Sequence, residues 1–436
     1  MDFKGSKDMG ERFHALIPGG SHTYAKGDDQ YPEFIRPYIV RGKGSHVWDV
    51  DGNEFIEYNM GIRAVALGHA YQPVVDAAYR QMQLGANFVR PSPVELECAE
   101  QLLGMIHGAE MVKFSKNGSD ATNAAIKLSR AYTGRDMVAI CGSHPFFSVD
   151  DWFIGSTPMS AGIPQAVQDL TVKFQYNNLD SVRALFERYP GEIACVILEP
   201  EKEEQPKDGF LHKVQELCRK NGSVFILDEM ITGFRWHNSG AQYVHGITPD
   251  LCTFGKALGN GFSVSALVGK ADLMRLGGLD HDRERVFLMS ATHGAETHGL
   301  AAAIATMKVY QSEPVVETLW RQGARLASGL QEVIDLNGLS QYIPLMGRPC
   351  CLVYGTRDTE LQPSQPFRTL LLQETLKRGV MAPSLVVSYS HTDADIDKTI
   401  DVFDDALKTY RKALDEGIDQ YLEGRTVQPV WRRFNH

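Results

Sequence analysis

The sequence predicts an α/β fold, with a large domain built on a mostly parallel central sheet flanked by helices and a smaller α+β domain built from the N- and C-terminal parts. From about residue 70 to 310, apolar β-rich runs with few charges alternate with amphipathic helical stretches, as in a buried parallel sheet. A chain of 436 residues is also longer than one hydrophobic core usually serves. Polar residues of chemical interest follow several of the apolar runs.

The predicted elements follow in chain order. Residues 36–58 read as short strands around a turn at 51–53. The strands expected in the large domain are 111–114, 137–141, 193–198, 223–227, 251–254 and 263–268. The helices expected in the chain are 120–132, 179–188, 212–220, 299–310, 314–336, 367–378 and 393–414, with short strands near 351–354. The predicted boundaries place 1–69 and 311–436 in the small domain and 70–310 in the large one.

Charge and apolar content exclude several classes of protein. Lys and Arg number 44 against 54 Asp and Glu, a formal net charge of −10, so no basic surface for nucleic acid or an anionic membrane is expected. No apolar run approaches the ~20 residues of a membrane span, and the first residues lack the apolar stretch of a secretory signal. Seven cysteines without CxxC spacing predict reduced thiols in the cytoplasm, with no metal site and no disulfide framework.

Four polar segments follow four of the predicted strands. They are Gly118-Ser119, Gly142–His144, Asp228 and Lys256. Ligands of open α/β sheets bind outside the carboxyl ends of the strands. These segments therefore predict one shared site at that edge of the sheet.

Asp228 ends an apolar strand, where an isolated carboxylate is costly unless it meets a cation or hydrogen-bond donors. The protonated pyridine nitrogen of pyridoxal 5′-phosphate (PLP) is such a partner, and the aspartate keeps that ring charged as an electron sink. A helix cap or a structural ion pair is the simpler explanation for the same pattern taken alone.

Lys256 lies in a Gly-rich turn, T-F-G-K-A-L-G-N-G, over residues 253–261. Small neighbours allow its amine to reach into a cleft, and a semi-buried site favours the neutral amine that forms a Schiff base. An ordinary surface lysine is the alternative. The run lacks the GxxxxGK[ST] pattern of a nucleotide-binding P-loop.

Asn117, Gly118 and Ser119 lie between a predicted strand and a helix. Free backbone N–H groups and a hydroxyl at a helix N-terminus favour a phosphate group. An ordinary helix N-cap explains the same residues and is compatible with phosphate binding.

With these segments in place, the chain resembles the class III (ω-type) aminotransferases, and most of all the glutamate-1-semialdehyde 2,1-aminomutase-like subgroup. The run 228–235, D-E-M-I-T-G-F-R, is similar to the family's D-E-V-M-T-G-F-R, and 254–256, F-G-K, stands at its L-G-K. Residues 130–135 and 246–251 also match closely. The resemblance extends from residue 18 to 392 and implies PLP fold type I.

The resemblance implies roles for individual residues. Lys256 carries PLP as an internal aldimine, and Asp228 contacts the pyridine nitrogen. Met230 covers one face of the ring where the family has valine, and Asn117, Gly118 and Ser119 form the phosphate cradle. Thr292 matches the family threonine that reaches the phosphate from the neighbouring subunit, which implies a homodimer with shared active sites.

Several positions depart from the family patterns. The cradle pattern N-S-G-T-E is K-N-G-S-D over 116–120, and the T-x-S-G-N-P segment is T-H-G-A-E-T over 292–297. The family's stacking aromatic lies in a G-x-Y-H-G run, which here is G-S-H-P-F, so His144 is expected to stack on the cofactor. A structural histidine is the alternative.

The positions expected to face the substrate differ more. Lys26 takes the place of the mutase arginine in N-S-P-V-R that grips the substrate carboxylate, and a lysine lacks the bidentate fork of arginine. Arg63 and Arg90 are new cationic positions, each a candidate for holding an anionic group or for a structural ion pair. The F-E-A-G-F stretch of the mutase is also missing near the C-terminus.

The sequence thus predicts an aminotransferase that moves an amino group from a donor, expected to be L-glutamate, to an aldehyde or ketone acceptor, for which a sugar-like molecule is the candidate. Lys256 is expected to be the acid and base of the proton shift. The alternative is an intramolecular aminomutase acting on glutamate-1-semialdehyde or a related amino aldehyde. A non-catalytic relative with a binding or regulatory role is the third hypothesis, and the presence of both Lys256 and Asp228 argues against it.

Overall fold

The computed structural model describes residues 1–144 and 146–435. The chain divides into two compact units. The first comprises Met1–Tyr71 and Glu317–Arg432, and the second comprises Gln72–Val316 with the chain end from Arg433.

The second unit is built on a seven-stranded sheet with the strand order β4-β10-β9-β8-β7-β5-β6. Its strands are β4 (Met111–Ser115), β5 (Met137–Cys141), β6 (Thr171–Phe174), β7 (Ile193–Leu198), β8 (Val224–Asp228), β9 (Leu251–Phe254) and β10 (Ser265–Gly269). Strands β9, β8, β7, β5 and β6 are parallel, whereas β10 is antiparallel to both of its neighbours. Because two antiparallel pairings restore the direction, β4 runs the same way as β9. The predicted mostly parallel sheet is confirmed.

All strand residues of β5, β7, β8, β9 and β10 are buried, which explains their continuous apolar sequences. Strand β6 was not predicted. It lies at the edge of the sheet, and its sequence T-V-K-F carries the exposed Lys173. A four-residue edge strand with a charged side chain lacks the apolar run that identifies a central strand.

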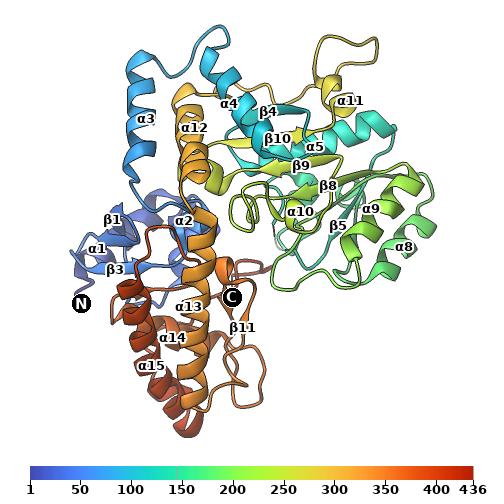
Figure 1. Cartoon of the computed structure of the whole chain (residues 1–436). Coiled ribbons are helices and arrows are strands. Elements are labelled where there is room, and N and C mark those ends of the chain that lie inside the picture. The colour runs from blue at the N-terminus through green and yellow to red at the C-terminus, as the bar shows by residue number, and fades with distance from the viewer. Residues whose placement is uncertain (145, 436) are drawn as a thin grey trace. The chain divides into compact units, whose positions relative to one another are not determined.

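Helices surround this sheet. They are α3 (Gln72–Leu84), α4 (Pro93–Met105), α5 (Gly118–Thr133), α6 (Asp151–Ile154), α7 (Gln165–Gln168), α8 (Leu179–Arg188), α9 (Phe210–Asn221), α10 (Ala241–Val244), α11 (Ala271–Met274) and α12 (Thr297–Ser312). Helix α5 packs across β4, β10, β9, β8 and β7, while α12 packs against α3 and α4 (Figure 1). Helix α5 ends at Gly134, whose φ of 67° is the left-handed conformation that favours glycine after a helix.

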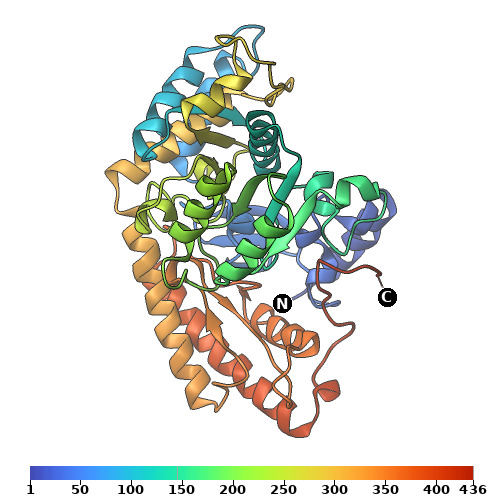
Figure 2. The same cartoon turned by 90° about the vertical axis from the view of Figure 1, so that its right-hand side faces the viewer.

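The first unit combines a four-stranded sheet, in the order β1-β2-β3-β13, with several helices. Its strands are β1 (Ile39–Lys43), β2 (His46–Asp49), β3 (Glu54–Glu57), β11 (Leu345–Met346), β12 (Val353–Tyr354) and β13 (Val380–Met381). Its helices are α1 (Lys4–Leu16), α2 (Met60–Arg63), α13 (Val315–Leu336), which starts at the end of the second unit, α14 (Gln365–Leu376) and α15 (Asp393–Glu416). Helices α13 and α15 run side by side (Figure 2), joined by ion pairs such as Arg325–Asp397 at 2.7 Å.

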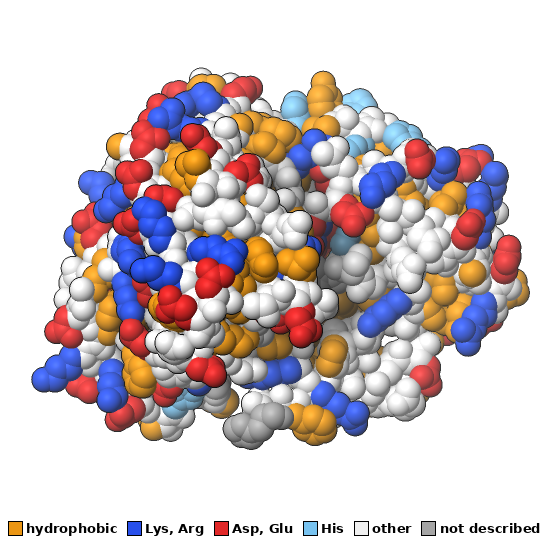
Figure 3. All heavy atoms as spheres, turned by 90° about the horizontal axis from the view of Figure 1, so that it is seen from below, with side chains coloured by type: hydrophobic (Ala, Val, Ile, Leu, Met, Phe, Trp, Pro, Cys, Tyr) orange, Lys and Arg blue, Asp and Glu red, His pale blue; other side chains and the backbone are white. Residues whose placement is uncertain are grey.

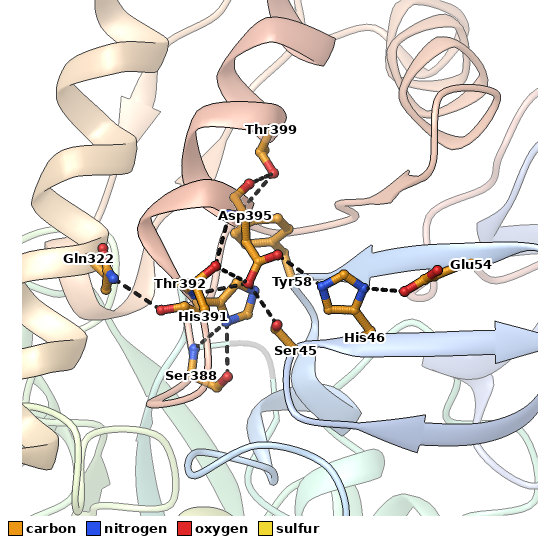
Figure 4. A network of polar contacts seen from close by, with 10 residues as sticks. All are labelled: Ser45, His46, Glu54, Tyr58, Gln322, Ser388, His391, Thr392, Asp395 and Thr399. Carbon is orange, nitrogen blue, oxygen red and sulfur yellow. Dashed lines mark hydrogen bonds and ion pairs between the residues drawn. The ribbon is translucent and has the colours of Figure 1, made fainter.

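A polar network lies between the sheet and α15 in the first unit (Figure 4). Asp395 accepts hydrogen bonds from the Thr392 backbone N–H at 2.9 Å and from Ser45 Oγ at 3.0 Å, and it contacts His46 Nε2 at 2.9 Å. Thr392 Oγ1 in turn accepts the Asp395 N–H at 3.1 Å, which completes a capping box at the start of α15. The N-terminal strands and the C-terminal helix are therefore joined through hydrogen bonds to Asp395.

The surface charges and the cysteines agree with the expectations from composition. Basic side chains are interspersed with acidic ones on the face shown in Figure 3. The seven cysteines are all buried. Within residues 1–144 and 146–435, no helix is both long and apolar enough to cross a membrane, and no cluster of three or more His, Cys, Asp or Glu side chains is placed to hold a metal ion.

Candidate active site

The predicted site residues follow strands whose carboxyl ends lie at the same edge of the large sheet. Asp228 is the last residue of β8, Lys256 follows the neighbouring β9, and His144 lies three residues beyond β5. The turn at Asn117 follows β4, which runs parallel to β9. The topology therefore places these four segments along the same edge of the sheet.

Asp228 is a buried carboxylate held by two donors. Its Oδ1 accepts the Met230 backbone N–H at 3.0 Å and the Thr253 hydroxyl at 3.0 Å. Burial raises the pKa of Asp228 to about 6, although the positive charge of Lys256 and the two hydrogen bonds act in the opposite direction. A further cation beside this carboxylate would offset the cost of its burial.

Lys256 opens a short 3₁₀ turn, Lys256–Gly259, directly after β9. Its φ of 44° lies in the left-handed region, which costs a non-glycine residue free energy. The turn is closed by the Leu258 N–H, which donates to the Gly255 carbonyl at 2.9 Å. Strain at a lysine that acts electrostatically on Asp228 is typical of a functional position.

Met230 packs between two glycines of the site. A Cβ atom added at Gly118 would lie 2.9 Å from Met230 Sδ, and one added at Gly255 would lie 2.7 Å from the same sulfur. The thioether therefore occupies the space that side chains at these two positions would need. Met230 thereby joins the turn after β4 to the turn before Lys256.

The turn Asn117–Ser119 opens helix α5. Asp120 Oδ2 accepts the Asn117 N–H at 2.9 Å and the Ser115 hydroxyl at 2.7 Å, which fixes the approach to the helix. Ser119 is buried, and its Oγ accepts the Val149 N–H at 3.0 Å. This leaves the Ser119 hydroxyl hydrogen and the first backbone N–H groups of a 16-residue helix for an anion.

His144 is a buried, neutral imidazole. Its Nδ1 accepts the Glu199 backbone N–H at 3.0 Å, so the proton of the neutral ring lies on Nε2. Burial, together with the charge of Lys202, lowers the pKa of His144 to about 3. The ring lies 5.2 Å from that of Tyr176. His144 is thus held as a flat, uncharged ring at the edge of the sheet, as a stacking role requires.

The remaining predicted residues lie in other segments of the chain. Thr292 is exposed, and its carbonyl accepts a 3.0 Å hydrogen bond from the Asn87 side chain. Arg90 is exposed in the loop between α3 and α4. Lys26 and Arg63 belong to the first unit, where Lys26 is exposed and Arg63 has a φ of 65°. Their roles at the site stay predictions.

Three residues at this edge of the sheet escaped the sequence analysis. Thr253 binds Asp228, the Glu199 backbone orients His144, and Glu229 accepts N–H groups from Ala241 at 2.9 Å and Gln242 at 2.6 Å. Only Glu229 carried a signal, because a second carboxylate directly after Asp228 at the end of an apolar strand also demands donors. The contacts of Thr253 with Asp228 and of Glu199 with His144 can be recognised only once the pairing of neighbouring strands is known.

A model of the family Aminotransferase class-III matches residues 27–407 of the chain. The chain belongs to the class III aminotransferases. Among curated relatives of this class III aminotransferase, a glutamate-1-semialdehyde 2,1-aminomutase of Desulfitobacterium hafniense is 32% identical, over 93% of this chain and 98% of the relative. A 3-aminobutyryl-CoA aminotransferase of Cloacimonas acidaminovorans is 29% identical, over 94% and 98%.

The structure of the FumI protein from Sphingopyxis sp. MTA144, solved in its PLP internal aldimine form, is similar to this class III aminotransferase. It superposes with a TM-score of 0.86 at 27% identity, over 94% of this chain and 97% of that one. The fold is therefore PLP fold type I, and the enzyme uses PLP as its cofactor.

The described residues fit that cofactor. Asp228 is a buried carboxylate next to which a cationic ring nitrogen is favourable, and Lys256 supplies an amine within its electrostatic reach. The N-terminus of α5 supplies donors for a phosphate. Side chains at Gly118 and Gly255 would collide with Met230, so this part of the site is shaped by small residues.

Proposed function

We propose that this class III aminotransferase transfers an amino group between two molecules, from L-glutamate to an aldehyde or ketone acceptor that carries hydroxyl groups, as a sugar does. Lys256 and Asp228 are the proposed catalytic residues. Asn117, Gly118, Ser119, His144, Met230 and Thr292 are the proposed further cofactor contacts. Lys26, Arg63 and Arg90 are the proposed substrate-binding cations.

The proposed binding mode divides the cofactor among these residues. Ser119 and the N–H groups at the start of α5 hold the phosphate, while Met230 and His144 lie against the ring. Asp228 keeps the ring nitrogen protonated, because a cation there offsets the burial that raises the carboxylate's pKa. When bound, PLP supplies an electron-withdrawing ring that eases removal of the proton from the carbon next to the amino nitrogen.

Lys256 moves that proton in the proposed reaction. Its amine is displaced when the donor's amino group binds, and it is then free to act as a base. It would take the proton from the donor carbon and give it to the cofactor carbon that Lys256 itself had bonded, so that water can release the donor as a keto acid and leave its amino group behind. A rigid short turn, with φ of 44° at Lys256, keeps the amine near both positions.

Transfer between molecules is supported by the residues at the positions proposed to face the substrate. These residues differ from the mutase pattern, whereas Lys256 and Asp228 match it. Lys26 stands where the mutase pattern has its carboxylate-gripping arginine, and a lysine gives no bidentate contact. The exposed segment around Thr292 and His293 is rich in hydrogen-bonding groups, which supports a hydroxylated acceptor.

Intramolecular transfer on glutamate-1-semialdehyde is the second candidate. The 32% identical relative from Desulfitobacterium hafniense supports it, because that protein is named as such an aminomutase. The 29% identical aminotransferase supports the first candidate with equal coverage.

Half-reaction spectroscopy separates the two. The holoenzyme is mixed with L-glutamate, and the cofactor absorbance is followed together with release of 2-oxoglutarate. Loss of the PLP absorbance with one equivalent of 2-oxoglutarate per site is expected. No reaction with glutamate, combined with turnover of glutamate-1-semialdehyde, would reject intermolecular transfer. A panel of hydroxylated aldehydes and ketones, added to the aminated enzyme, then tests the acceptor class.

We also propose a homodimer in a reducing, cytoplasmic location. Helix α3 buries Val74 and Ala78 but exposes an apolar stripe of Val75, Tyr79 and Met82, at the i, i+4, i+7 spacing of one helix face. Exposed apolar stripes of this kind support contact with a second copy. Sedimentation of the wild type and of Tyr79→Glu tests the proposal: a dimer that the charge weakens supports it, and a wild-type monomer rejects it. The seven scattered cysteines, which show no CxxC spacing, support the location.

A further inference from the structure

Two side chains next to the phosphate-binding turn differ in charge from the family patterns, and they contact each other. Lys116 takes the position of the Asn in the family pattern N-S-G-T-E, and Glu296 takes the position of the Asn in T-x-S-G-N-P. Lys116 Nζ donates a charge-assisted hydrogen bond to Glu296 Oε2. Their side chains are only 22% and 21% exposed, so water and salt screen this pair less than a surface pair.

The Lys116 end of the pair is fixed to the sheet. Its carbonyl accepts the Ser263 hydroxyl at 3.1 Å, and the carbonyl of the following Asn117 accepts the Ser265 hydroxyl at 2.7 Å. The backbone of Lys116 therefore has little freedom beside the proposed phosphate turn. Because this backbone is held, the Lys116 amine can hold its partner Glu296 in place.

The Glu296 end connects two loops. Glu296 is the N-cap of α12, and the next residue, Thr297, donates from its backbone N–H to the Ala86 carbonyl at 3.0 Å. Asn87, next to Ala86, donates from its side chain to the Thr292 carbonyl at 3.0 Å. The loop that carries Thr292 is thus tied to the loop that carries Arg90, and Glu296 ties both to Lys116.

Glu296 is ionised in this setting. The hydrogen bond from Lys116 is the main cause that lowers its pKa, burial opposes it, and His298 and His293 contribute at 3.9 and 3.2 Å. Lys116 is the closest of the three basic groups, so the carboxylate is directed toward the turn at Asn117–Ser119.

We propose that Lys116 and Glu296 are positioning residues that form a latch between the phosphate turn and the Thr292 loop, and that this latch sets how tightly the holoenzyme retains PLP. The proposal rests on the proposed roles of Ser119 and Thr292 as phosphate contacts, Ser119 in the site of its own chain and Thr292 in the site of the neighbouring subunit. It assigns neither residue a direct contact with the cofactor. The competing explanation is that Lys116 itself binds the phosphate and that Glu296 only weakens it.

A double-mutant cycle on the holoenzyme distinguishes the two. The rate of PLP loss from wild type, Lys116→Gln, Glu296→Gln and the double variant is followed by absorbance after transfer to buffer that holds a PLP-trapping amine. A latch predicts that each single variant loses PLP about 5-fold faster and that the double variant resembles either single, because residues of one interaction are not additive. Lys116→Arg, which keeps the ion pair, is expected to stay within about 2-fold of wild type.

Three outcomes would overturn the latch: slower PLP loss in Glu296→Gln, single effects that simply add, or single variants that equal wild type. Lys308→Gln is the matched control, since the exposed pair Lys308–Glu97 at 3.0 Å lies elsewhere in the same unit, and no change is expected. Thermal unfolding of each apoenzyme separates lost positioning from a fold defect. No substrate is added, so the result is independent of the proposed donor and acceptor.

Discussion

The hydroxyl of Thr253 donates a 3.0 Å hydrogen bond to Oδ1 of Asp228, and the two residues lie opposite each other in the neighbouring parallel strands β9 and β8. The strand pairing thereby orients a buried carboxylate whose pKa burial raises to about 6. The hydrogen bond favours the ionised form, which is the form a protonated ring nitrogen needs.

Removing this hydrogen bond is expected to slow amino transfer without abolishing it. Thr253→Val keeps the shape and deletes the donor, and a loss of about 3- to 10-fold in the rate of the half-reaction is predicted. Rapid mixing of the holoenzyme with donor measures it. Thr306→Val is the control, because that buried hydroxyl bonds only the Ala302 carbonyl within α12, at 2.8 Å. Equal rates in both variants would show that Thr253 does not tune Asp228.

Asp228→Asn should be far more damaging. The amide cannot keep a ring nitrogen protonated, so a fall of about 100-fold or more in kcat/KM is expected, with PLP still bound. Steady-state kinetics and the cofactor content of the purified variant check this together. A variant with near wild-type activity would remove Asp228 from its proposed catalytic role.

Lys256→Ala is expected to reduce the turnover rate by about 1000-fold or more, because both the covalent attachment and the proton carrier are lost. Borohydride reduction followed by peptide mass mapping gives a second readout. The wild type should carry the reduced cofactor on Lys256, and the variant should carry none. A label on another lysine would reassign the attachment site.

Gly118→Ala tests the close packing of Met230. The new methyl group would lie 2.9 Å from Met230 Sδ, so the thioether must move and PLP affinity is expected to fall by about 10-fold. Adding Met230→Ala should restore part of the loss by making room. Gly104→Ala is the control, since nothing lies within 4 Å of a Cβ at that position. An unchanged affinity in Gly118→Ala would contradict the packing argument.

The bridge between His46 and Asp395 predicts a pH-dependent stability of the first unit. The hydrogen bond to Asp395 is the main cause that raises the pKa of His46, so this contribution is present below about 6.5 and is lost as the pH rises through the raised value. Burial opposes ionisation of Asp395, but hydrogen bonds from His46, Thr392 and Ser45 outweigh it and lower its pKa. Its contribution is therefore present above about 3.8 and is lost only at lower pH.

His46→Gln should consequently lower the Tm by about 2–4 °C at pH 6 and by less at pH 9. Thermal unfolding at a series of pH values measures the difference. His22→Gln, at an exposed histidine of the same unit, should show no such trend. A difference between His46→Gln and wild type that stays constant with pH would argue that His46 contributes by packing alone.

Local sequence patterns determined most of the fold. The apolar runs that became β5, β7 and β9 were predicted at the bounds observed, and so was helix α8. A continuous apolar run of about five residues between turn signals is typical of a buried strand. Both faces of such a strand are covered, so its side chains on both sides are apolar. Strand β6 escaped because an edge strand needs no such run.

The sequence by itself also predicted Asp228 and Lys256 as site residues, because a carboxylate ending an apolar strand and a lysine in a Gly-rich turn each need a special partner. Only the tertiary structure decided what holds them. Thr253 and the Met230 sulfur reach the site through strand pairing and packing, and the Glu199 N–H that orients His144 comes from the residue that follows β7, 55 positions further along the chain. Such contacts join residues that are distant in sequence, and no local periodicity encodes them. The Lys116–Glu296 pair, whose members are 180 positions apart in the sequence, depends in the same way on the chain first folding into its sheet.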